Sequence, residues 1–222
     1  MRQMKKLFVV SDIHGHYTAL KQALDDAGYD PENENHLFVC CGDLFDRGKE
    51  NRKVYEYIRS LKRRILVRGN HDARLAKVLR QGFIEPYDYR NGGMETVGEF
   101  FGWSAIGSDW RLNLSGNRAL AEDLCNLVDN MLHYWETEHY VFTHGWLPLE
   151  PDTNVSRLCA DWRHADELLW HRARHGEWQV LYHSEAKLPD RTIVCGHRST
   201  RYAKSLTPNV CLQIAVYSTV TA

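Results

Sequence analysis

The chain has 222 residues, of which 43% are hydrophobic and 26% are charged, as is usual for a water-soluble globular protein. Its formal net charge is −1, so no overall basic field favours nucleic acid as a partner. No stretch approaches the ~20 apolar residues of a membrane span, and the first apolar run, over residues 7–10, is too short for a signal peptide. We therefore expect one domain over residues 1–222, located in the cytoplasm, without a membrane or nucleic-acid partner.

The first 80 residues alternate between short apolar runs and amphipathic segments. The runs over residues 6–10, 37–41 and 64–67 predict buried strands. Between and after them, apolar side chains recur at helical spacing, which predicts helices over residues 17–27, 49–61 and 72–80. Strands that alternate with helices of this length pair in parallel through right-handed crossovers, so the sequence predicts an α/β fold.

The remainder of the chain is less regular. Residues 81–93 are rich in Gly, Pro and Asn and predict a loop, in which Asn91, Gly92 and Gly93 form a turn. Apolar periodicity predicts helices over residues 94–101, 118–132 and 162–178, and strands over residues 139–143, 191–195 and 210–216. The sequence contains no internal repeat and no linker, which supports the prediction of a single domain.

Five short segments place Asp, Asn or His beside glycine, and each follows a predicted strand. They are residues 12–15, 42–48, 69–72, 143–145 and 196–197. In open α/β sheets, ligands bind beyond the carboxyl ends of the strands. We therefore expect the segments to converge in space through Asp12, Asp43, Asn70, His144 and His197.

The residue types in these segments are typical of a site for two metal ions. In extended chain, positions two apart point to the same side, so Asp12 and His14 form a pair of ligands. We predict that one cation is held by Asp12, His14 and Asp43, and that Asp43 bridges to a second one held by Asn70, His144 and His197. Mixed nitrogen and oxygen ligands without thiolates suit Mn²⁺, Fe or Zn²⁺. Two such cations produce hydroxide at neutral pH and clamp a phosphoryl group, which predicts a phosphoesterase.

Three further side chains are predicted to act on the substrate. His71 follows Asn70 and is the candidate general acid for the leaving oxygen, and Asp46 would favour its protonated form. The planar guanidinium of Arg47 matches two phosphoryl oxygens. Taken alone, residues 46–48 are equally consistent with an exposed turn before the next helix. Their place beside Asp43 favours the functional interpretation.

These segments resemble the metallophosphoesterase superfamily and, within it, the phosphoprotein phosphatase branch. That branch reads Gly-Asp-x-x-Asp-Arg-Gly and Gly-Asn-His-Asp/Glu, which residues 42–48 and 69–72 match. The chain is most similar to the small bacterial and bacteriophage λ-type serine/threonine protein phosphatases. The resemblance implies an α/β, calcineurin-like sandwich of two mixed β-sheets flanked by α-helices. It also implies Mn²⁺ as the activating ion, and a phosphorylated protein or a small phosphorylated metabolite as the partner.

The resemblance further implies a second phosphate-binding arginine after residues 143–145. The λ-type pattern Trp-x-Arg is matched at Arg172, and Arg163 and Arg174 are alternatives. The related bacterial diadenosine tetraphosphatases lack an Asp at the position of Asp46. The sequence therefore favours phosphomonoesters over dinucleoside polyphosphates or other nucleotides as substrates.

A non-catalytic member of the fold is a third alternative to these two enzymes. Relatives carry an Asp-Thr-Gly-like turn after the last ligand His, and residues 210–222 lack it. Against this alternative stands the presence of all six predicted ligands together with His71.

Overall fold

The computed structural model describes residues 6–146, 149–150, 157–158, 192–197 and 210–212, and every structural statement below concerns these residues. The helix predicted over residues 162–178 lies outside them, as does the end of the last predicted strand. Among the described residues, no helix is long and apolar enough to cross a membrane. The prediction of one domain over residues 1–222 stays a prediction.

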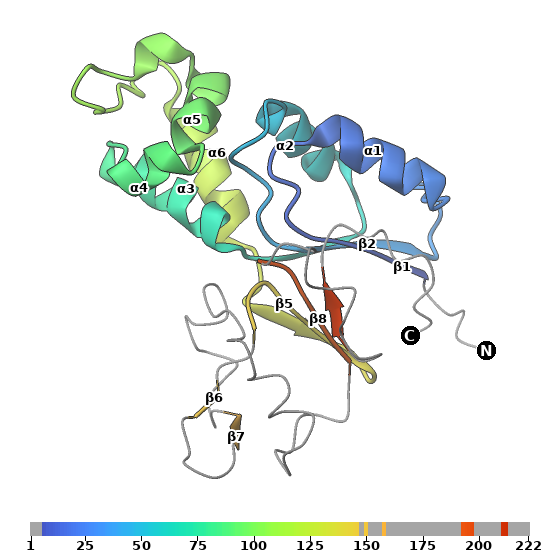
Figure 1. The fold of residues 1–222 in the computed structure, drawn as a ribbon. Coiled ribbons are helices and arrows are strands. Elements are labelled where there is room, and N and C mark those ends of the chain that lie inside the picture. Colours follow the sequence, from blue (N-terminus) through green and yellow to red (C-terminus); the bar gives the residue numbers. More distant parts are fainter. Residues whose placement is uncertain (1–5, 147–148, 151–156, 159–191, 198–209, 213–222) are drawn as a thin grey trace.

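The first sheet is parallel, as the alternation of strands and helices predicts. It consists of β1 (Lys6–Val10), β2 (His36–Cys41) and β3 (Arg64–Val67), in the order β1-β2-β3. The connections contain α1 (Tyr17–Asp26) and α2 (Asn51–Ser60), which lie on one side of this sheet (Figure 1). All five elements were predicted from the sequence to within two residues at each end.

The strands of the first sheet are buried on both faces, which explains their unbroken apolar runs. One face packs under the helices in a core that includes Phe8, Val10, Phe38, Cys40 and Leu66. The alternate side chains form a second core with Phe142 and Val194 of the other sheet, and these are Leu7, Val9, Val39, Cys41 and Val67. The period of two along each strand therefore builds a sandwich with helices outside it.

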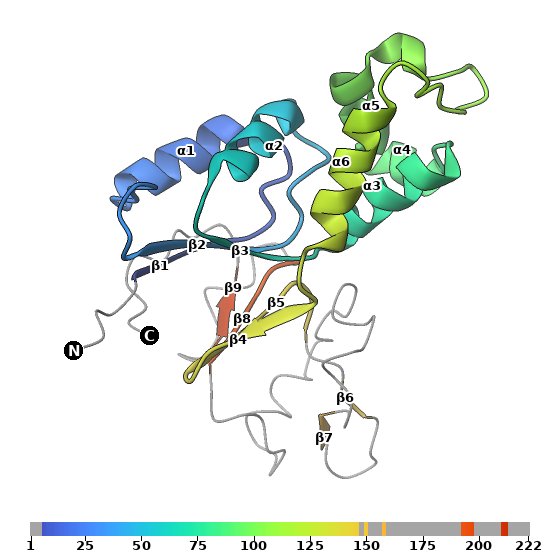
Figure 2. The ribbon, with the colours of Figure 1, turned by 180° about the vertical axis from the view of Figure 1, so that it is seen from behind.

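The second sheet is mixed and lies on the side of the first sheet opposite α1 and α2 (Figure 2). It has the order β4-β5-β8-β9, in which β4–β5 is antiparallel and the other two pairings are parallel. The four strands are β4 (Tyr134–Glu136), β5 (Tyr140–Thr143), β8 (Thr192–Cys195) and β9 (Val210–Leu212). A separate antiparallel pair is formed by β6 (Leu149–Glu150) and β7 (Arg157–Leu158). The predicted α/β sandwich is confirmed, with the first sheet parallel rather than mixed in its described part.

Four helices and a 3₁₀ turn lie at the edge of the sandwich next to β3 (Figure 2). They are α3 (Asn70–Gln81), α4 (Pro86–Arg90), α5 (Gly93–Phe101), the turn Trp103–Ala105, and α6 (Arg118–Asp129). Helix α3 begins two residues before its predicted start, so Asn70 and His71 lie in its first turn.

The loop predicted over residues 81–93 is wrong in part, because α4 lies within it. Pro86 occupies the first turn of α4, where a missing N–H costs nothing. The side chain of Asp88 accepts the backbone N–H of Glu85, and Arg74 of α3 forms hydrogen bonds with the carboxylates of both residues. Contacts with α3 therefore stabilise a helix too short to show a periodic pattern. The expected turn is present at residues 91–92 and links α4 to α5, which begins at Gly93.

Candidate metal centre

The six predicted metal ligands meet at one end of the two sheets. They come from the segments that follow β1, β2, β5 and β8 and from the first turn of α3. Five of the six are buried, and His197 is partly buried. The convergence expected from the carboxyl ends of separate strands is therefore present, and its members are Asp12, His14, Asp43, Asn70, His144 and His197.

The carboxylate of Asp43 lies between two histidines. Its Oδ2 is 3.5 Å from Nε2 of His14 and 3.4 Å from Nε2 of His144. On the far side, Nε2 of His144 is 2.9 Å from Oδ1 of Asn70. Atoms that ligate one cation at about 2.0–2.2 Å lie about 3–3.5 Å from each other. One carboxylate oxygen is thus placed to serve two cations at once.

The imidazoles are oriented by backbone carbonyls behind them. Nδ1 of His14 donates to the carbonyl oxygen of Phe45 at 2.8 Å, and Nδ1 of His144 donates to that of Cys41 at 2.7 Å. In each ring Nε2 is therefore the atom that faces Asp43, as is usual for metal-ligating histidines. Nε2 of His14 is buried and has no hydrogen-bond partner among the described residues. Buried polar atoms normally have a partner, and a bound cation would supply one for this nitrogen.

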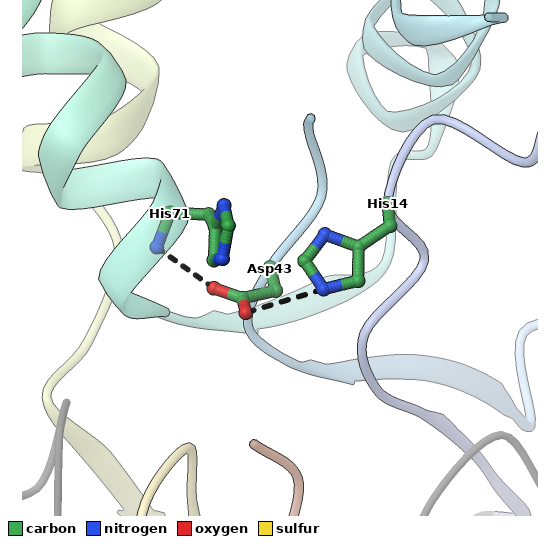
Figure 3. A group of neighbouring side chains, drawn as sticks. All are labelled: His14, Asp43 and His71. Atoms are coloured by element: carbon green, nitrogen blue, oxygen red, sulfur yellow. Dashed lines mark hydrogen bonds and ion pairs between the residues drawn. The ribbon is translucent and has the colours of Figure 1, made fainter. Parts of the chain in front are cut away.

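Asp43 belongs to two groups of potential ligands. The ligand atoms of His14, Asp43 and His71 (Figure 3) lie within 4.8 Å of one another. The ligand atoms of Asp43, His144 and His197 lie within the same distance of one another. Oδ1 of Asp12 is 4.0 Å from Nε2 of His14.

The side chain of Asp12 is tied to the segment after β8. Both of its carboxylate oxygens accept the backbone N–H of His197, at 3.1 and 3.0 Å. This contact joins the first sheet to the second at the site.

Four of the predicted ligands have left-handed backbone conformations. The φ angles are 51° at Asp12, 46° at His14, 58° at Asp43 and 67° at His197. A non-glycine residue in this region costs about 1–3 kcal/mol, so it persists only where its surroundings hold it. Residues with this strain cluster at functional sites, and here the strain turns several side chains toward one point.

The buried ionisable groups of the site change one another's pKa values. Burial opposes ionisation of Asp43, but the neighbouring histidines, His144 first, hold the pKa of its carboxyl well below its usual range. Burial lowers the pKa of His144, yet Asp43 outweighs this effect and raises the pKa to about 9. The site therefore concentrates negative charge that protons or divalent cations compensate.

Gly69 allows the start of α3 to approach Asp43 closely. A Cβ at this position would overlap with Oδ1 and the backbone nitrogen of Asp43. We expect Gly69→Ala to destabilise the protein by about 1–3 kcal/mol through overpacking and to weaken metal binding. Calorimetry of this variant beside Gly116→Ala tests this expectation, because a Cβ at Gly116 meets nothing within 4 Å. Equal melting temperatures for both variants would contradict it.

Asp72 is a fully buried carboxylate for which the sequence predicted no role. It accepts the backbone N–H groups of Asp43, Leu44 and Gly69, each at 2.9 Å. It therefore fixes the segment that presents Asp43 to the first turn of α3. The capping position three residues after Gly69 was the sequence signal that could have identified it.

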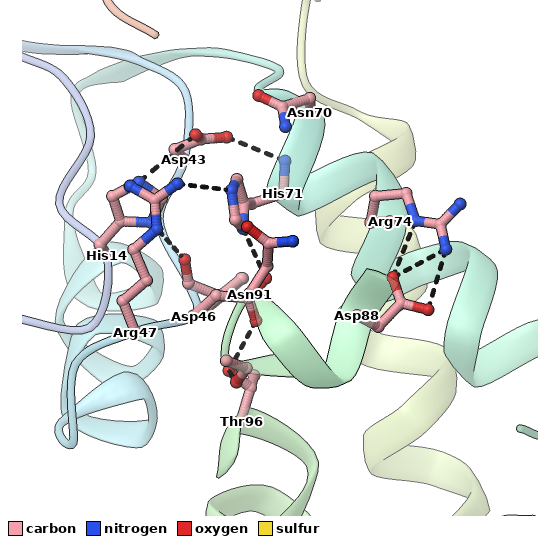
Figure 4. Close-up of polar contacts among 12 residues, drawn as sticks. His14, Asp43, Asp46, Arg47, Asn70, His71, Arg74, Asp88, Asn91 and Thr96 are labelled. Carbon is pink, nitrogen blue, oxygen red and sulfur yellow. Dashed lines mark hydrogen bonds and ion pairs between the residues drawn. The ribbon is translucent and has the colours of Figure 1, made fainter. Parts of the chain in front are cut away.

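The residues predicted to act on the substrate also lie together (Figure 4). Nδ1 of His71 donates to Oδ2 of Asp46 at 2.7 Å, and an N–H of Arg47 donates to Nε2 of His71 at 3.1 Å. Burial lowers the pKa of His71, but the hydrogen bond to Asp46 and the charge of Asp43 outweigh it, so the pKa is raised. Arg172 and its alternatives, Arg163 and Arg174, lie outside the described residues.

Known proteins resemble this chain over different spans. A symmetrical bis(5'-nucleosyl)-tetraphosphatase of Aeromonas salmonicida is 41% identical over 70 residues, which is 31% of this chain and 25% of the relative. The protein of the same name from Buchnera aphidicola (Acyrthosiphon pisum, strain 5A) is 38% identical over 72 residues, or 32% of this chain and 26% of the relative. The chain therefore matches only about a quarter of the length of these relatives.

Solved structures resemble the chain over most of its length. A candidate diadenosine tetraphosphatase superposes with a TM-score of 0.55 at 16% identity, covering 95% of this chain and 83% of the other. A protein serine/threonine phosphatase from Saccharomyces cerevisiae superposes with a TM-score of 0.51 at 17% identity, covering 88% and 61%. At these identities the likeness shows the fold alone. The model of the calcineurin-like phosphoesterase family matches residues 5–218, and the chain belongs to that family.

Proposed function

We propose that this chain hydrolyses phosphoric esters with two divalent cations. The observation that carries the proposal is the position of Asp43 Oδ2 between Nε2 of His14 and Nε2 of His144. Asp12 would complete the first set of ligands, and the second set would be completed by Asn70 and His197. When bound, two cations lower the pKa of a water molecule and neutralise phosphoryl oxygens. Mn²⁺ is the first ion to test, with Fe and Zn²⁺ as alternatives.

His71 supplies the proton for the leaving oxygen in this proposal. An arginine N–H can only donate, so Nε2 of His71 accepts from Arg47, and the ring holds its proton on Nδ1 toward Asp46. When Arg47 turns to the phosphoryl oxygens, Nε2 becomes free to carry a proton. The carboxylate of Asp46 then stabilises the charged ring and keeps Nε2 directed at the leaving group.

Two substrate classes are supported by different observations. The bacterial relatives described above are named bis(5'-nucleosyl)-tetraphosphatases, and these names favour a dinucleoside polyphosphate over a phosphoprotein as the substrate. The pair of Asp46 and His71 favours a phosphomonoester of an alcohol. An alkoxide leaves only with a proton, whereas a nucleotide phosphate leaves readily without one.

A direct comparison of substrates tests the proposal. The Mn²⁺-loaded protein would be given diadenosine tetraphosphate and peptides carrying phosphoserine, phosphothreonine or phosphotyrosine, and kcat/KM would be measured for each. We expect hydrolysis of at least one class, abolished by a chelator and restored by Mn²⁺. A higher kcat/KM for diadenosine tetraphosphate than for the phosphopeptides would indicate the activity for which the bacterial relatives are named. Absence of hydrolysis of every substrate, with both cations bound, would contradict the proposal.

Arg47 is expected to bind the phosphoryl group through two parallel hydrogen bonds. Replacement by Lys keeps the charge but removes the planar fork, and hydrogen bonds to charged groups are each worth about 1.5–3 kcal/mol. We therefore expect Arg47→Lys to lower kcat/KM by about 10–100-fold and to weaken inhibition by inorganic phosphate. The control is Arg111→Lys, because the Arg111 side chain is 77% exposed and pairs with Asp109. An unchanged inhibition constant would show that Arg47 does not bind phosphate.

A further inference from the structure

A third residue extends the pair formed by Asp46 and His71. Thr96 lies on α5, is fully buried, and donates its hydroxyl to Oδ1 of Asp46 at 2.7 Å. The other oxygen of Asp46, Oδ2, accepts from Nδ1 of His71, also at 2.7 Å. The three side chains therefore form one buried row that runs from the helical layer to the metal centre (Figure 4).

The proton of the Thr96 hydroxyl is directed to Asp46. The carbonyl oxygen of Gly92 is also near this hydroxyl, at 3.0 Å, but it already accepts the backbone N–H of Thr96 at 3.1 Å. A carboxylate is the stronger acceptor, and 2.7 Å is the length typical of a hydroxyl bound to a charged oxygen. Without this donor, one oxygen of a buried carboxylate would lose its hydrogen bond.

Helix α5 is anchored to the turn that carries Asp46 at a second point. Glu99 lies about one turn after Thr96 and accepts the backbone N–H of Asn51 at 2.6 Å, at the start of α2. The side chain of Asn51 in turn accepts the backbone N–H of Asp46 at 2.9 Å. Asp46 has a φ of 74°, a conformation that such contacts have to hold.

We propose that Thr96 is a positioning residue for the proton donor of this site. An Asp carboxylate rotates easily about its Cβ–Cγ bond. Donors on both oxygens of Asp46 fix that torsion, so Oδ2 stays against His71 and the ring presents Nε2 to the substrate. The catalytic part of this inference rests on the function proposed above, whereas the orienting contact does not.

Kinetics of Mn²⁺-loaded Thr96→Val and Thr96→Ser test the catalytic part. Phenyl phosphate needs a proton on its leaving oxygen, whereas 2,4-dinitrophenyl phosphate does not. For Thr96→Val we expect kcat/KM to fall by about 10–100-fold on phenyl phosphate, the range found when a metal-ligating histidine loses an outer hydrogen-bond partner. The loss on the dinitrophenyl ester should be much smaller, and Thr96→Ser should restore both values. An equal loss on the two esters, or no loss on either, would overturn the inference.

A spectroscopic measurement tests the orienting contact without turnover. The proton on Nδ1 of His71 can be observed by NMR in histidine-labelled protein and assigned by its absence in His71→Asn. We expect it to shift and to exchange faster with water in Thr96→Val, and to be retained in Thr96→Ser. An unchanged signal in Thr96→Val would overturn the inference. If that variant does not fold, Thr96→Ala is measured in the same way with the same two outcomes.

These two readouts separate the inference from the function on which its catalytic part rests. A wild-type protein that hydrolyses neither ester would contradict the proposed function. In that case the NMR signal still decides whether Thr96 orients Asp46 and His71.

Discussion

Replacement of His71 by Asn is expected to lower turnover of phenyl phosphate by about 10²–10⁴-fold, the usual contribution of a general acid. Nδ1 of His71 is held by Asp46, so Nε2 is the ring nitrogen left to donate a proton, and an Asn side chain cannot deliver a proton from that position. The measurement is kcat at saturating substrate and Mn²⁺. Turnover of 2,4-dinitrophenyl phosphate should fall far less, because its leaving group needs no proton.

The matched control for this substitution is His139→Asn. His139 is exposed and directly precedes β5. Its ring makes a T-shaped contact with Tyr140, with ring centroids 6.5 Å apart. We expect this variant to keep the wild-type rate. Near-full turnover of phenyl phosphate by His71→Asn would show that another group donates the proton.

Replacement of Asp43 by Asn is expected to remove both cations, because its carboxylate lies beside both His14 and His144. Oδ1 accepts the backbone N–H of His71 at 2.9 Å, so an amide in the same orientation keeps its oxygen there. Its NH₂ group would then face Nε2 of His14 and of His144, where a cation has to bind. The metal content should fall from two ions per chain to less than one, measured by elemental analysis after gel filtration.

Activity should fall together with the metal content of Asp43→Asn. The expected loss in kcat is at least the 10²–10³-fold that removal of a single electrostatic donor costs. Asp123→Asn is the control, because Asp123 is a surface carboxylate paired with Arg59 and its side chain is 54% exposed. Two Mn²⁺ ions per chain with unchanged affinity in Asp43→Asn would contradict the bridging role.

The sequence was sufficient for the first sheet and for the positions of the candidate ligands. Strands β1 and β3 occupy their predicted residues, because a polar residue, Ser11 or Arg68, follows each apolar run directly. The ligands were predicted to converge because each follows a strand, a property that depends on chain order and needs no knowledge of contacts. Helix α3 starts early because the side chain of Asp72 caps it from within the ligand segment.

Other features depend on contacts between distant residues, and local patterns do not show them. Strand β4 has only three residues and exists through its pairing with β5. Helix α4 is fixed by Arg74 from another helix. Thr96 looks like any helical threonine in the sequence, and its partner Asp46 lies 50 positions away.

The left-handed conformations at Asp12, His14 and Asp43 are uncommon for residues other than glycine. Several tertiary hydrogen bonds surround them, including those from the backbone of Asp12 to Gly42 and from the backbone of His14 to Asp43. Conflict between local preference and observed conformation is expected at a functional site, where tertiary contacts compensate for the strain.

Anomalous X-ray scattering from crystals of the Mn²⁺-loaded protein would show whether Asp43 bridges two cations. We expect two Mn²⁺ peaks about 3.5–4 Å apart, with Oδ2 of Asp43 between them, His14 beside one ion and His144 beside the other. A single ion, or two ions that do not share Asp43, would contradict this expectation.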